Sequence, residues 1–128
     1  MLAPRRIRFF VALFDTLAAV GVAAYGTAFP LVPRGDLPFH LTASWGAVLA
    51  ALLALVAVTF DLAILGWVAV GYLLWAGLLA GHALSLLFVA LAISLAPVVP
   101  RPGGSLLQGV VVALGTAAVI ALIRRPYI

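Results

Sequence analysis

The sequence predicts an all-α integral membrane protein, a compact bundle of five transmembrane helices joined by very short loops. Of its 128 residues 67% are hydrophobic and only 8% are charged, whereas soluble domains are roughly half apolar and a quarter charged. Clusters of Pro, Gly and Arg divide the apolar residues into runs long enough to cross a hydrocarbon core about 30 Å thick. A chain of this length builds one domain, so we expect residues 1–128 to fold as a single unit.

The first and last helices are the easiest to place, because basic residues and proline bound them. We expect the first helix at residues 9–29, between an arginine cluster and Pro30, and the last at 106–123, before Arg124. The first run is longer than the roughly 7–15 apolar residues of a cleaved secretory signal, and it contains Asp15. We therefore expect it to remain as a membrane span.

The stretch between the two Pro- and Gly-rich breaks, residues 41–99, contains Asp61 and His82 as its only acidic or basic side chains. Polar residues and a glycine at 59–62 and 81–82 favour two tight turns, because a turn inside lipid would leave backbone groups unsatisfied. This predicts three helices, at about 41–59, 63–80 and 83–99. The alternative is two longer helices with a turn inside 68–77, which would give four spans in all.

The seven arginines predict the orientation of the chain in the membrane. Basic residues favour the cytoplasmic side, so we expect the N-terminus of the chain to be cytoplasmic and the cell (inner) membrane to be its location. Five spans divide the arginines four to three and four spans divide them five to two, so this rule favours four. Loop chemistry favours five, and we give it more weight because the orientation rule has exceptions.

Two acidic residues are the candidates for chemistry inside the membrane. Asp15 lies about two turns into the first helix, where a charged carboxylate is costly. Five spans place Asp61 on the same side, so the two acids predict a possible proton or cation site. The alternatives are that Asp15 pairs with Arg8 or Arg101 and fixes helix register, and that Asp61 is a turn residue or the N-cap of the next helix.

Small and aromatic residues predict packing faces and interface anchors. Glycines allow close approach of helix backbones in lipid, and four of them mark the expected packing face: Gly66, Gly71, Gly77 and Gly81. A contact with another subunit and packing within this chain are equally compatible with that pattern. Three tryptophans near the expected helix ends are predicted to anchor at the headgroup level: Trp45, Trp67 and Trp75.

The sequence also excludes several classes of function. It has no cysteine and no hydrolase, metalloprotease or phosphate-loop motif, so we expect no enzyme activity, no metal site and no cofactor. Its arginines flank apolar runs, so we expect no nucleic-acid partner. The leading hypothesis is a small non-catalytic subunit or scaffold of a larger membrane assembly, with the lipid bilayer and a membrane protein or a second copy as partners. The alternative is a small ion or solute transporter or channel that works as a homo-oligomer.

Overall fold

The computed structural model describes residues 5–28, 37–79, 86–100 and 105–123, and these residues form helices and turns without a strand. The described residues form five helices: α1 (Arg5–Ala28), α2 (Leu37–Phe60), α3 (Ala63–Leu79), α4 (Leu86–Leu95) and α5 (Leu106–Ile123). The prediction of an all-α bundle of five helices is therefore confirmed for the part of the chain that the structure describes.

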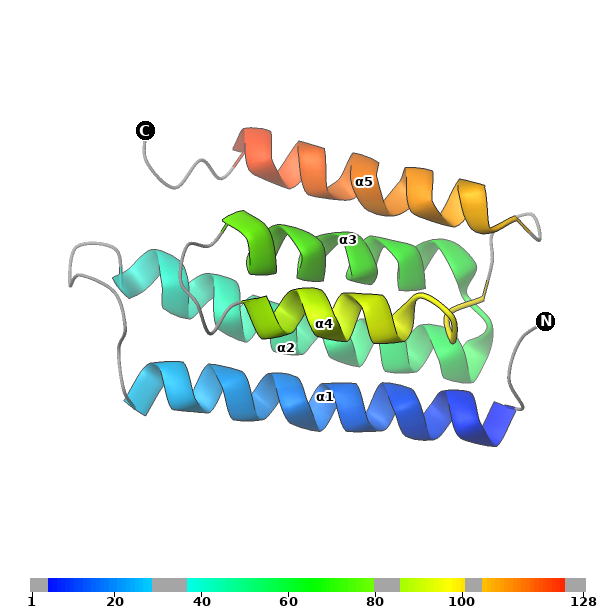
Figure 1. Ribbon diagram of the computed structural model, residues 1–128, viewed down its shortest axis with the longest axis horizontal. Helices are drawn as coiled ribbons and strands as arrows, with labels where there is room; N and C mark the ends of the chain where they lie inside the picture. Colours follow the sequence, from blue (N-terminus) through cyan, green and yellow to red (C-terminus); the bar gives the residue numbers. More distant parts are fainter. Residues whose placement is uncertain (1–4, 29–36, 80–85, 101–104, 124–128) are drawn as a thin grey trace.

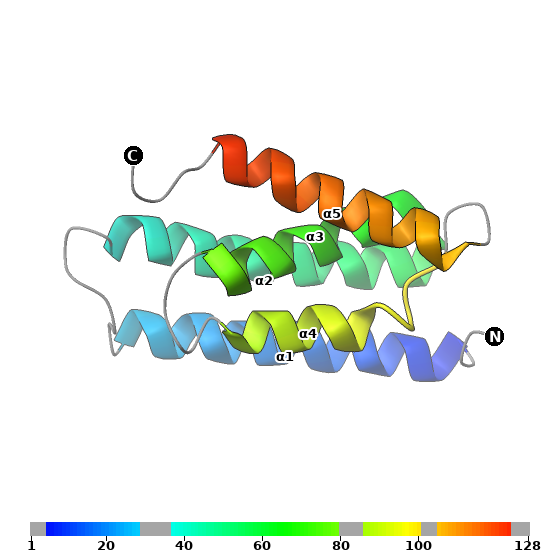
Figure 2. The ribbon, with the colours of Figure 1, turned by 45° about the horizontal axis from the view of Figure 1, so that its top comes forward.

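The helices run alternately in opposite directions along one long axis (Figure 1). α3 is the central helix, and it packs against α2, α4 and α5. α1 packs mainly against α2 and makes a smaller contact with α4, whereas the main neighbour of α5 is α3. Figure 2 shows α5 lying above the other helices, with the start of α1 and the end of α5 at opposite ends of the bundle.

The alternative of two longer helices between the breaks is wrong, because α3 continues without a break through residues 68–77, where their turn would have been. The predicted turn at 59–62 is present, since α2 ends at Phe60 and α3 begins at Ala63. The other predicted turn, at 81–82, lies outside the described residues.

Proline accounts for two helix boundaries that differ from the prediction. α2 begins at Leu37, four residues before the prediction, because Pro38 lies in its first turn, where a missing N–H leaves no hydrogen bond unmade. α4 ends at Leu95 rather than residue 99, because Pro97 cannot donate the next helical bond, and Val98 N and Val99 N both bond to Leu95 O instead. The predicted start of α4 at residue 83 lies outside the described residues.

Length and composition make two of the described helices candidates to cross a membrane: α1 over Arg6–Tyr25 and α5 as a whole. Three shorter helical segments are also apolar: Ser44–Phe60, Ala63–Leu78 and Leu86–Leu95. The ten residues of α4 that the structure describes extend about 15 Å, half of a hydrocarbon core, and the residues that precede Leu86 lie outside the described part of the chain.

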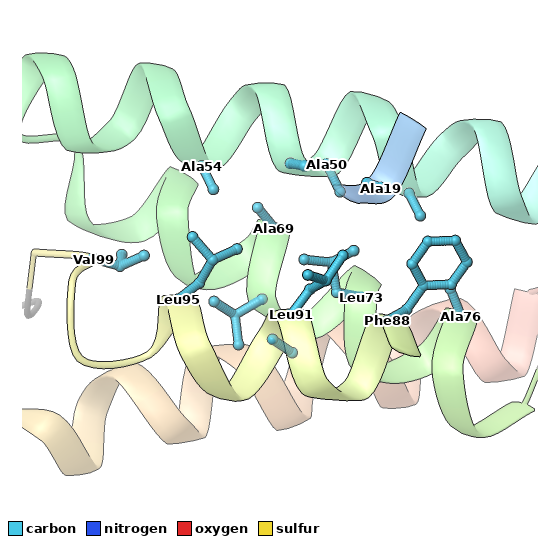
Figure 3. Packing of buried hydrophobic residues seen from close by; sticks show 14 of the residues in the cluster. Ala19, Ala50, Ala54, Ala69, Leu73, Ala76, Phe88, Leu91, Leu95 and Val99 are labelled. Carbon is cyan, nitrogen blue, oxygen red and sulfur yellow. The ribbon is translucent and has the colours of Figure 1, made fainter. Parts of the chain in front are cut away.

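The core of the bundle is built mainly from small side chains. Among the described residues, alanine makes up about half of the buried apolar side chains. Figure 3 shows Ala50 and Ala54 of α2 facing Ala69 of α3 and Leu95 of α4. The large apolar side chains Leu, Ile, Phe and Val dominate the exposed surface. Small residues inside let the helices pack closely, as they do in membrane bundles.

Candidate functional site

Asp15 is buried between α1 and α4 and is only 2% exposed. It lies on the inner face of α1 with Ala12 and Ala19, at the spacing of three and four residues that places side chains on one side of a helix. From α4, the hydroxyl of Ser94 lies 2.6 Å from Asp15 Oδ2. A carboxyl group therefore joins the first and fourth helices inside a mainly apolar core.

The hydroxyl of Ser94 has two acceptors and one hydrogen. Ser94 Oγ lies 2.6 Å from Asp15 Oδ2 and 2.8 Å from Leu91 O, and a serine hydroxyl donates one hydrogen bond at a time. Ser94 can donate to an ionised Asp15 and leave Leu91 O, or donate to Leu91 O and accept a hydrogen from a protonated Asp15. The pair is thus a site where gain or loss of one proton rearranges the hydrogen bonds.

The structure does not bring the two predicted acids into one site. Asp61 is 60% exposed and faces Arg8, whose Nη1 lies 3.9 Å from Asp61 Oδ1. The described contacts join Asp61 to Arg8 and Asp15 to Ser94, and none joins the two acids. The alternative that Arg8 pairs with Asp15 is wrong, because Arg8 reaches the turn after α2 instead; Arg101 lies outside the described residues.

Asp61 has a structural role in the turn between α2 and α3. Its φ is 56°, in the left-handed region where Asp is tolerated better than most residues. Leu62 N donates to Ala57 O across 2.9 Å, the six-to-one bond of a Schellman motif, with Asp61 at the left-handed position. Asp61 is thus a turn residue, one of the two alternatives given for it above. The carbonyl of Leu62 accepts from Gly66 N at 3.2 Å, so Leu62 precedes the first residue of α3.

We expect Asp61→Val to destabilise the protein by about 1–2 kcal/mol relative to Asp61→Gly. Both variants remove the ion pair with Arg8, so its loss cancels in the comparison, but only glycine adopts a positive φ without strain. The free energy of unfolding in detergent micelles measures the difference. Equal stability of the two variants would show that the turn does not depend on the left-handed residue.

The predicted packing glycines occupy different surroundings. A Cβ on Gly66 would collide with Val99 and lie 3.2 Å from Ala57, whereas one on Gly71 would collide with the carbonyl oxygen of Ala113 on α5. Gly77 is buried, and Gly81 lies outside the described residues. A glycine that the sequence analysis missed, Gly109 of α5, lies against the ring of Trp67.

The prediction that all three tryptophans are interface anchors is wrong for two of them. Trp67 and Trp75 are each 1% exposed. Trp67 Nε1 donates to Pro100 O across 2.9 Å, so its polar group has a partner inside the core. The centroid of the Trp75 ring lies 5.4 Å from that of Tyr72. Trp45 is exposed and is the remaining candidate anchor.

An apolar cavity of about 130 Å³ lies between α3, α4 and α5. Its walls include Val70 of α3, Ala96 after α4 and Val110 of α5. Within the described residues no group of three or more His, Cys, Asp or Glu side chains converges. The buried chemistry of the described bundle is therefore concentrated at Asp15 and Ser94.

These features define a class: an all-α bundle of five antiparallel helices with small residues inside, large apolar residues outside and one buried carboxyl group. No protein-family model, curated protein or solved structure matches this chain. The function must therefore be argued from the described residues themselves.

Proposed function

We propose that this chain is a small multi-pass protein of the cell (inner) membrane that acts as a non-catalytic subunit of a larger membrane assembly. The observation that carries the proposal is the inverted distribution of side-chain size. Alanine dominates the core, while large side chains such as Leu107, Leu114 and Ile123 are exposed. Soluble proteins rarely expose extended apolar surface unless it meets lipid or a partner.

The placement of α5 supports a role as a subunit. Its buried residues are Gly109 and Ala113, which meet α3, and its remaining surface is largely exposed. Gly115 lies on that surface, with no neighbouring atom within 4 Å of where a Cβ would be. A helix held along one narrow face, with a glycine on its open side, offers a second helix a close approach. We therefore assign the open side of α5 to the partner.

Purification of the full chain in mild detergent, followed by mass spectrometry of the proteins that accompany it, tests this proposal. We expect a stoichiometric membrane protein that is lost from Gly115→Phe and retained by Gly21→Phe. Gly21 is the matched control, because it also has open space around its Cβ position but lies on α1. Recovery of the chain alone, or loss of the partner from both variants, would contradict the proposal.

A second candidate function is a proton or cation transporter that works as a homo-oligomer, and the burial of Asp15 beside Ser94 favours it. The Asp15→Asn variant, which keeps the shape of the side chain and removes its charge, distinguishes the two candidate functions. If the chain is a transporter, Asp15→Asn abolishes flux into proteoliposomes while the protein stays folded. If the chain is a subunit, the same variant assembles with its partner as before.

A further inference from the structure

Phenylalanine and arginine side chains border an open groove at one end of the bundle. The groove has a volume of about 330 Å³ and runs between the start of α1 and the end of α2. α1 contributes Arg6, Phe9 and Phe10, and α2 contributes Val58 and Thr59. Figure 1 shows that these two helix ends lie side by side. An apolar floor with a cation at its edge thus faces outward at this end.

The charge of Arg6 is not neutralised by an acid in the described part of the chain. The sequence has three acidic residues: Asp15 bonds to Ser94, Asp61 faces Arg8, and Asp36 lies outside the described residues. Arg6 is exposed and also lies in the first turn of α1, which contains no acidic residue. The positive end of the helix dipole adds to this cationic field, so the groove edge favours an anion.

We propose that this groove binds one anionic phospholipid, with its phosphodiester on Arg6 and an acyl chain along Phe9 and Phe10, which are both exposed. An arginine can lay its aliphatic stem on apolar surface while its guanidinium reaches the headgroup level. The cytoplasmic leaflet, where we place the N-terminus, is the one rich in anionic lipid. This inference rests on the proposed membrane location, but not on the identity of a protein partner.

Native mass spectrometry of the purified full chain, titrated with phosphatidylglycerol or phosphatidylcholine of identical acyl chains, tests the site. We expect the wild-type protein to prefer phosphatidylglycerol. Arg6→Gln should weaken phosphatidylglycerol binding about fivefold, the equivalent of roughly 1 kcal/mol for one basic residue at a membrane surface. It should weaken phosphatidylcholine binding less, because the choline cation offsets the charge of the phosphodiester in that lipid. Arg8→Gln is the matched control, because Arg8 faces Asp61, and it should keep the preference.

A second pair of variants tests the apolar part of the groove. Phe10→Ala should weaken both lipids equally, whereas Phe14→Ala should weaken neither, because Phe14 is exposed one turn further along α1 and does not line the groove. Glycerol 3-phosphate, which carries the anion without acyl chains, should not compete. Competition by glycerol 3-phosphate, or an equal loss of preference in Arg6→Gln and Arg8→Gln, would overturn the site.

The experiment distinguishes an error in the lipid site from an error in the proposed membrane location. A protein that needs detergent and binds the two phospholipids equally would overturn the lipid site and leave the membrane location standing. A protein that stays monomeric in water without detergent and binds neither lipid would overturn the membrane location, and the lipid site with it.

Discussion

We expect Gly71→Ala to lower the free energy of unfolding by about 1–3 kcal/mol, the usual cost of an overpacked core position. The added Cβ would collide with the carbonyl oxygen of Ala113 and lie 2.8 Å from Cβ of Thr116, both on α5. Backbone atoms cannot rotate away as a flexible side chain can, so the two helices must separate. Because α3 is the main neighbour of α5, this change loosens the attachment of the last helix.

Gly115→Ala is the matched control for that prediction. It makes the same chemical change in α5, but the new methyl group meets no atom within 4 Å. Alanine favours a helix interior over glycine by up to about 1 kcal/mol, so we expect this variant to be as stable as the wild type or more stable. Unfolding of both variants in mixed detergent micelles gives the comparison. Equal stability would show that α3 and α5 are not in close contact at Gly71.

The number of helices was predictable because local chemistry determines where a helix can stop. α2 ends at the polar turn around Asp61, and α4 ends at the Pro-rich break. The residue types at both places predict the end of a helix. The boundaries were less predictable, since proline acts differently at different positions. Pro38 is tolerated in the first turn of α2, where a residue has no intrahelical acceptor for its N–H. Pro97 ends α4, because at that position a helix needs an N–H that donates to the preceding turn.

The contacts of the candidate site were much less predictable than the helices. Asp15 was identifiable as a polar residue in an apolar run, but nothing in the sequence distinguishes Ser94 from the other serines as its partner, 79 positions away. Likewise, the position of Trp67 near a helix end predicted a lipid-facing ring. In the structure its ring lies against Gly109, and its Nε1 donates to the carbonyl of Pro100. Hydropathy does not encode such contacts between distant parts of the chain.

Loss of the contact between Asp15 and Ser94 is the second change that we expect to lower the free energy of unfolding strongly. We expect Ser94→Ala to destabilise the protein by about 1–3 kcal/mol, because it leaves a carboxyl group that is only 2% exposed without the partner that the structure gives it. Since Asp15 and Ser94 lie on α1 and α4, the substitution weakens the contact between these two helices. The free energy of unfolding in mixed micelles measures it.

Asp15→Asn is the informative comparison, because asparagine keeps the shape of the side chain and removes its ability to ionise. Its amide can donate to Ser94 Oγ while Ser94 donates to Leu91 O, which lies 2.8 Å away, so both contacts survive. We therefore expect Asp15→Asn to be much less destabilising than Ser94→Ala. The double variant Asp15→Asn/Ser94→Ala should be less stable than Asp15→Asn alone, because the amide then has no serine hydroxyl to donate to. If Asp15→Asn costs as much as Ser94→Ala, the carboxylate itself accepts from Ser94, and the contact depends on the negative charge.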